Sequence, residues 1–130
     1  GGRVEKSYVA NLGRNWYRIK VQEQDASTPE GEYRIKQMFR STSFGAALLL
    51  DYPNAADWQR FSSMKKTGEI AARAQIGGSI EIHGGGRLNS DWTDGCVSLE
   101  NPDMNSLFRS AYVGMPVTIV GTCTIGGGNE

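Results

Sequence analysis

Residues 80–86 of the chain read Ile-Glu-Ile-His-Gly-Gly-Gly, and residues 92–99 read Trp-Thr-Asp-Gly-Cys-Val-Ser-Leu. Polar and apolar residues alternate from Ser79 to Ile82, which is typical of a half-buried strand, and the glycines that follow end it. His83, the single histidine of the chain, then lies at the end of a strand, and Cys96 follows a glycine-rich loop. This order predicts that a rigid element holds the histidine beside a loop.

His83 and Cys96 are candidates for a catalytic pair. A cysteine attacks a carbonyl carbon as the thiolate, so a nearby imidazole that accepts the thiol proton is the minimal requirement. Gly95 permits a positive φ or a close approach of substrate, and the N–H groups of Gly95 and Cys96 would form an oxyanion hole. Spacing along the chain does not establish contact, and a cysteine here is also compatible with a small buried side chain.

The two stretches resemble the catalytic segment of the YkuD-type L,D-transpeptidases of bacterial cell walls. In that family a His-Gly pair is followed, after a loop, by Ser/Thr-His-Gly-Cys and an apolar residue. The matching residues here are His83-Gly84 and Thr93-Asp94-Gly95-Cys96-Val97. Further matches in the expected order are Thr28-Pro29-Glu30-Gly31-Glu32-Tyr33, Asn101-Pro102-Asp103-Met104 and Gly114-Met115-Pro116-Val117-Thr118-Ile119, so the resemblance covers most of the chain.

The resemblance implies a fold and a chemistry. The fold is mainly β with two helices (α+β), a YkuD-like mixed β-sandwich or partial barrel, in one catalytic domain over residues 1–130 with a flexible tail at 122–130. The chemistry is that of a cysteine acyltransferase without a cofactor, in which Cys96 is the nucleophile, His83 is the base and the Gly84 carbonyl holds the imidazole in the useful tautomer. The expected substrate is the stem tetrapeptide of peptidoglycan, which would be joined through a thioester to a second stem as a 3-3 cross-link, or to another amine.

Two alternative functions, one enzymatic and one non-catalytic, stay open at this point. An L,D-carboxypeptidase or endopeptidase would form the same thioester and let water resolve it. A non-catalytic domain that binds the cell wall would keep the fold without needing Cys96. Because peptidoglycan lies outside the inner membrane, the expected location is periplasmic or cell-wall-associated, although no signal peptide is recognisable in this sequence.

Two residues depart from the family pattern. Asp94 stands where the family has a histidine, which leaves His83 as the only imidazole base, and Ser98 stands where an Arg or Asn is often found. Asp94 is expected to orient His83 or to cap a turn. Arg87 is a candidate for holding a stem carboxylate, or else a solvated loop arginine. The complete set of expected substrate contacts is Arg87, Trp92, Thr93, Asp94, Ser98 and Tyr52.

Composition limits the class of partner. The 130 residues suit one domain, and 14 basic against 14 acidic side chains leave no net charge, so nothing favours nucleic acid or an anionic membrane. No apolar run is long enough to span a membrane.

One histidine and two cysteines do not make a convincing zinc site. A disulfide between Cys96 and Cys123 is disfavoured because it would consume the nucleophile. The oligomeric state stays open.

Strands are expected in the first third of the chain. Arg3–Ala10 and Asn15–Val21 are strand-like runs around a turn at residues 11–14, which predicts a hairpin. A third strand is expected over Glu32–Phe39, and the apolar run Ala46–Tyr52 predicts a buried strand.

Two helices are expected further on. Asn54 is a cap for a helix that runs through Lys66 and ends at Gly68, with Trp58 and Phe61 as core anchors. Asn101 and Pro102 begin the second helix, whose apolar face would pack on the sheet and which would end at Gly114. A last strand is expected over Pro116–Val120.

Overall fold

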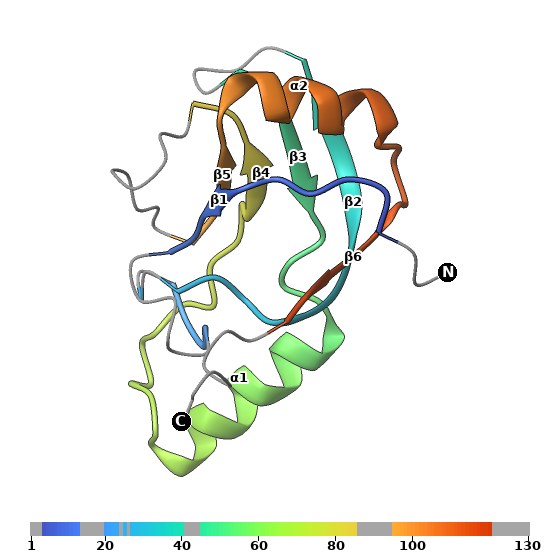
Figure 1. Cartoon of the computed structure of the whole chain (residues 1–130). Helices are drawn as coiled ribbons and strands as arrows, with labels where there is room; N and C mark the ends of the chain where they lie inside the picture. Colours follow the sequence, from blue (N-terminus) through green and yellow to red (C-terminus); the bar gives the residue numbers. More distant parts are fainter. Residues whose placement is uncertain are drawn as a thin grey trace.

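In the described part of the chain, six strands form one curled sheet with helices at its two ends (Figure 1). The structure is a computed structural model and describes residues 4–13, 20–23, 25, 27–40, 45–85 and 95–120. The elements in chain order are β1 (Ala10–Asn11), β2 (Gly31–Phe39), β3 (Ala47–Leu50), α1 (Ala55–Thr67), β4 (Glu81–His83), β5 (Val97–Leu99), α2 (Asn101–Ser110) and β6 (Pro116–Ile119). The strand order is β1-β5-β4-β3-β2-β6, and among these neighbours only β4 and β5 are parallel. The expected mainly β fold with two helices is confirmed.

The long strand β2 is shared between two neighbours. Its first residues, Gly31–Arg34, pair with β6, and its last ones, residues 37–39, pair with β3. The register shifts between Ile35 and Gln37, and such an irregularity bends a strand and increases its twist. The sheet therefore curls between β3 and β6 instead of continuing flat (Figure 1).

The hydrophobic core is formed by the sheet together with residues from both helices. Leu48 of β3 is 1% exposed, Met104 of α2 is 0% exposed and Phe61 of α1 is also buried. Burial of such a side chain stabilises the fold by roughly 1.5–3 kcal/mol. The apolar run that predicted a buried strand does form one, β3, and both Ala46 before it and Tyr52 after it are buried.

Helix α1 begins and ends as the sequence predicts. The Asn54 side chain accepts the N–H of Asp57 at 3.0 Å, and the Asp57 carboxylate accepts the N–H of Asn54 at 2.9 Å, which together form a capping box. Gly68 closes the helix with φ 78°. Trp58 is not the core anchor that was expected, since it is 50% exposed. The buried face of α1 is centred on Asp57 and Phe61, so Trp58 lies to one side of it.

Helix α2 differs from expectation at both ends. Asn101 is its first residue and not its cap; the cap position is Glu100, which makes no side-chain capping bond. The Asn101 side chain accepts the N–H of Gly85 instead, at 2.9 Å. The helix ends at Ser110 rather than at Gly114, which lies in the turn before β6 with φ 92° and donates its N–H to the carbonyl of Ile35. The last strand lies where it was predicted.

The expected N-terminal hairpin is wrong in the part that the structure describes. β1 contains only Ala10 and Asn11, and it pairs with β5 through Ala10 and Leu99, so Asn11 lies in a strand and not in a turn. Residue 14 of the predicted turn, residues 15–19 of the second predicted strand and the predicted tail at 122–130 lie outside the described residues. Within the described ranges, neither helix has the length and apolar character needed to cross a membrane.

Candidate active site

The parallel pair of β4 and β5 brings the two predicted catalytic residues to adjacent strands. Ile82 pairs with Val97 and His83 pairs with Ser98, which places Cys96, the residue before β5, beside Glu81. His83 is the last residue of β4, roughly 7 Å further along the strand than Glu81. A histidine and a cysteine separated by twelve intervening residues are therefore neighbours across one strand pair.

Backbone groups of Glu81 and Ser79 lie beside the sulfur of Cys96. The N–H of Glu81 donates to Sγ at 3.3 Å, and the thiol faces the carbonyl of Ser79 at 3.5 Å. Ser79 has φ 56°, a left-handed conformation that is uncommon for a residue other than glycine. The Glu81 N–H favours the thiolate, because the hydrogen bond is stronger to the charged form, whereas donation to the Ser79 carbonyl is possible only for the protonated thiol.

The imidazole of His83 is held by the residue that follows it. Nδ1 lies 2.7 Å from the carbonyl oxygen of Gly84, and the side chain is 9% exposed. Because a carbonyl oxygen only accepts hydrogen bonds, Nδ1 carries the proton and Nε2 of the neutral ring does not. This is the tautomer that a general base needs at Nε2.

Gly95 lies close to neighbouring segments of the chain. Its φ is 144°, and a Cβ at this position would lie 3.0 Å from the carbonyl oxygen of Ser27 and 3.2 Å from Cδ1 of Ile80. Both conditions favour glycine. The sequence suggested that Gly95 adopts a positive φ or allows a close approach of substrate. The structure shows the positive φ, and the segment that lies close to Gly95 is part of the chain itself, at Ser27.

Lys20 is a residue that the sequence analysis missed. It is 4% exposed, forms an ion pair with Asp25 at 2.9 Å and donates to the carbonyl of Gln22. Its Nζ would lie 3.8 Å from a Cβ on Gly95. Asp25 also accepts the N–H groups of Val21, Gln22 and Ser27, so it organises the segment that packs against Gly95. Nothing in the strand-like run Asn15–Val21 marks its lysine as a buried residue.

Ser98 lies in the sheet beside His83. It is 3% exposed, and within the described part of the chain its Oγ has no hydrogen-bond partner. A buried hydroxyl without a partner costs about 1–3 kcal/mol. Since buried polar groups in proteins normally have a hydrogen-bond partner, we expect the Ser98 hydroxyl to bind a group outside the described chain.

The other expected substrate contacts are less informative. Tyr52 is 6% exposed, and its hydroxyl donates to the carbonyl of Ile76 at 3.3 Å. Burial, followed by the charges of Asp57 and Asp25, raises the pKa of Tyr52 above its ordinary value. Its contact with substrate stays a prediction, as do those of Arg87, Trp92, Thr93 and Asp94, which lie outside the described residues. In the described ranges, no group of three His, Cys, Asp or Glu side chains is arranged to hold a metal ion.

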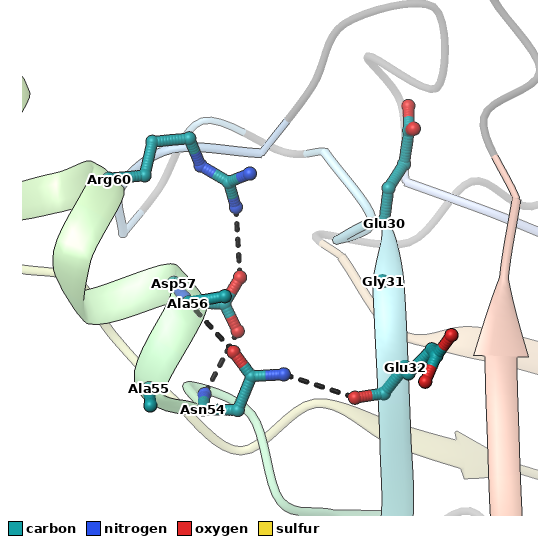
Figure 2. A pocket seen from close by; sticks show the side chains of 8 residues that line it. All are labelled: Glu30, Gly31, Glu32, Asn54, Ala55, Ala56, Asp57 and Arg60. Atoms are coloured by element: carbon teal, nitrogen blue, oxygen red, sulfur yellow. Dashed lines mark hydrogen bonds and ion pairs between the residues drawn. The ribbon is translucent and has the colours of Figure 1, made fainter.

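A pocket of about 560 Å³ lies elsewhere, between the start of β2 and the start of α1. Arg60 pairs with Asp57 at 2.9 Å, and the Asn54 side-chain amide donates to the backbone carbonyl of Glu32 at 3.0 Å (Figure 2). Tyr33 donates to both oxygens of Asp57, which is 4% exposed. Burial, and then the hydrogen bond to Asp57, raise the pKa of Tyr33 above its ordinary value near 10. We assign this cluster to stabilising α1.

Comparison with known proteins agrees with the fold. Residues 1–119 match the sequence model of the L,D-transpeptidase catalytic domain, YkuD. By sequence alone, no curated protein matches the chain. Among solved structures, the helical cell shape determining protein Pgp2 of Campylobacter jejuni, in a variant form, is 27% identical with a TM-score of 0.60, over 84% of this chain and 35% of that one.

Two further structures are similar in fold. Bd1075 of Bdellovibrio bacteriovorus is 22% identical with a TM-score of 0.61, over 93% of this chain and 41% of that one. L,D-transpeptidase 1 of Mycobacterium tuberculosis is 16% identical with a TM-score of 0.53, over 93% of this chain and 53% of that one. The chain thus spans between about a third and a half of the length of these three proteins.

Proposed function

Because the chain belongs to the YkuD family of L,D-transpeptidase catalytic domains, we propose that it is a cysteine-dependent peptidoglycan L,D-transpeptidase with Cys96 as the nucleophile and His83 as the base. The observation that carries this proposal is the contact between His83 Nδ1 and the Gly84 carbonyl, on the strand next to Cys96. It leaves Nε2 as the nitrogen that accepts a proton.

The first half of the reaction forms a thioester. His83 Nε2 takes the proton of the Cys96 thiol, and the sulfur attacks the carbonyl carbon of the bond between the third residue of the stem and the fourth, a D-alanine. The N–H groups of Gly95 and Cys96 would receive the negative charge on the carbonyl oxygen. When the carbon–nitrogen bond breaks, the leaving amine takes the proton from His83, and the stem stays on Cys96 as a thioester.

The second half decides the product. An amine of a second stem attacks the thioester carbonyl and passes a proton to His83, and the sulfur leaves and takes that proton back. The result is a 3-3 cross-link. If water attacks instead, the product is a tripeptide and the activity is that of an L,D-carboxypeptidase. The substrate places the protein in the periplasm or at the cell wall.

Ser98 supports the proposal as a substrate contact. Its buried Oγ has no partner in the described chain, and it lies opposite His83 in the strand pair. A hydroxyl both donates and accepts, so it suits a peptide group of the bound stem. The hydrogen bond would form when substrate binds and would remove the cost of the buried hydroxyl.

Purified disaccharide-tetrapeptide tests the function. We expect dimers that have lost D-alanine with the unaltered protein and with Cys123→Ala, and none with Cys96→Ala, as read by mass spectrometry. Cys123→Ala is the matched control for loss of a cysteine. If a tripeptide forms in a Cys96-dependent way and no dimers appear, the activity is hydrolysis and not transpeptidation. Binding without any product would support the non-catalytic alternative.

A further inference from the structure

A second pocket, of about 310 Å³, lies where β2 ends, β3 begins and α2 crosses the sheet. Arg40 follows the last residue of β2, and Ala46 precedes the first residue of β3. The α2 side is formed by Asn105, Phe108 and Arg109. The pocket therefore has a guanidinium from each of two different elements, with an amide and an aromatic ring between them.

We propose that this pocket binds a carboxylate of the peptidoglycan stem peptide through Arg40 and Arg109, an inference that rests on the proposed function. The Arg40 guanidinium lies 5.4 Å from the centre of the Phe108 ring, which restricts its orientation. In the described part of the chain, neither Arg40 nor Arg109 forms an ion pair with a carboxylate. Guanidinium groups bind carboxylates through two parallel hydrogen bonds, so a pair of them in one pocket favours an anionic ligand of this kind.

The walls of the pocket are hydrogen-bonded to the segment that follows His83. The N–H of Gly84 donates to the carbonyl of Ala46 at 3.1 Å, and the N–H of Gly85 donates to Asn101 Oδ1 at 2.9 Å. Asn101 and Asn105 lie one turn apart on α2, so both sides of the pocket are joined to this segment. Ala47, next to Ala46, pairs with His83. A carboxylate in the pocket would thus lie close to the proposed catalytic histidine, within the reach of an extended stem peptide.

The presence of two arginines in this pocket does not follow from an excess of basic residues in the chain. The chain carries 14 basic and 14 acidic residues, so two arginines in one pocket are a local feature. Loss of a hydrogen bond to a charged group typically weakens binding by about tenfold or more. Removal of both guanidinium groups should therefore have a clear effect on the binding of a stem that carries free carboxylates, and little effect on an amidated stem.

The test uses the Cys96→Ala protein, so that binding is measured without turnover. Calorimetry with disaccharide-tripeptide compares Arg40→Gln/Arg109→Gln with a control, Lys66→Gln/Arg73→Gln, which removes the same charge from exposed residues in and after α1. We expect affinity to fall about tenfold or more in the first variant and less than twofold in the control. Arg40→Lys/Arg109→Lys, which keeps the charge and loses the paired hydrogen bonds, should lie between them.

Three results would overturn the proposal: unchanged affinity in the double Gln variant, equal affinity for the carboxylate and amidated stems, or a loss as large in the Lys66 and Arg73 control. Competition by inorganic phosphate at the concentration of the stem would identify a general anion site and also overturn it. The outcome is separate from that of the proposed function. If the stem binds through the two arginines and no product forms with active protein, only the catalytic proposal fails.

Discussion

The backbone N–H of Glu81 donates a hydrogen bond to the sulfur of Cys96 over 3.3 Å, from the strand that ends at His83. The donor belongs to the sheet, so its position does not depend on a side-chain rotamer. It favours the thiolate, because a hydrogen bond is stronger to the charged form of the sulfur. The strand pair that forms part of the sheet thus also supplies a hydrogen bond to the proposed nucleophile.

Cys96 should react with iodoacetamide at lower pH than an ordinary thiol. We expect the alkylation rate to reach half its maximum well below the ordinary cysteine pKa of about 8.5, because the Glu81 N–H favours the thiolate and the proposed base, His83, would accept the thiol proton. The measurement is a pH series on Cys123→Ala, with mass detection. A midpoint at or above the ordinary value would contradict an activated Cys96.

Ser98→Ala should separate stability from substrate binding. Because Oγ has no partner in the described chain, its removal should leave the free energy of unfolding unchanged or raise it by about 1 kcal/mol. KM should rise several-fold while kcat changes little. Ser106→Ala is a suitable control, since Ser106 binds Lys6 and Tyr8: it should lower stability and leave KM unchanged. Destabilisation by Ser98→Ala without an effect on KM would show a structural role.

Gly95→Ala should damage both the fold and the site. Its φ of 144° and the 3.0 Å approach to the Ser27 carbonyl leave no room for a Cβ, so we expect a loss of about 1–3 kcal/mol in unfolding free energy and at least a tenfold loss of turnover. Urea unfolding and steady-state kinetics measure the two effects. Gly78→Ala, where a Cβ would meet nothing within 4 Å, should be close to neutral. Equal behaviour of the two variants would contradict this account of Gly95.

Tyr33→Phe should change how stability depends on alkaline pH. The pKa of Tyr33 is raised in the fold, so the phenol stays protonated there at a pH at which it ionises in the unfolded chain. Its contribution is complete below about pH 10 and is lost as the pH rises further. At pH 8 the free energy of unfolding of the variant should be lower by about 1–3 kcal/mol, since Asp57 loses a hydrogen-bond donor. Between pH 9 and 11, the free energy of unfolding should decrease less in the variant than in the unaltered protein. Thermal unfolding across this range tests both parts.

The features that were predictable from sequence are those with a local cause. The helix from Asn54 to Gly68 follows from its capping residues, and β3 follows from a run of apolar residues. The hairpin expected near Asn11 was wrong because β1 pairs with β5, some ninety residues away, and nothing in a local pattern specifies that partner.

In the proposed site, too, the residues that were predictable from sequence are those that belong to a local motif. His83 and Cys96 could be proposed from the sequence because a single histidine, a cysteine and several glycines form a local motif. Lys20 was missed because its burial depends on Asp25 and on the approach of Gly95, and Asn101 was taken for a helix cap because its bond to Gly85 joins distant segments. Long-range contacts of polar residues leave no periodicity in the sequence.

The most direct test of the central proposal, a thioester on Cys96, is the intact mass of the protein after brief exposure to disaccharide-tetrapeptide. We predict an adduct with the mass of the substrate less D-alanine on the unaltered protein and on Cys123→Ala, which peptide mapping assigns to Cys96 and which Cys96→Ala lacks. An adduct that persists in Cys96→Ala, or turnover without any adduct on Cys96 even after rapid acid quenching, would contradict it.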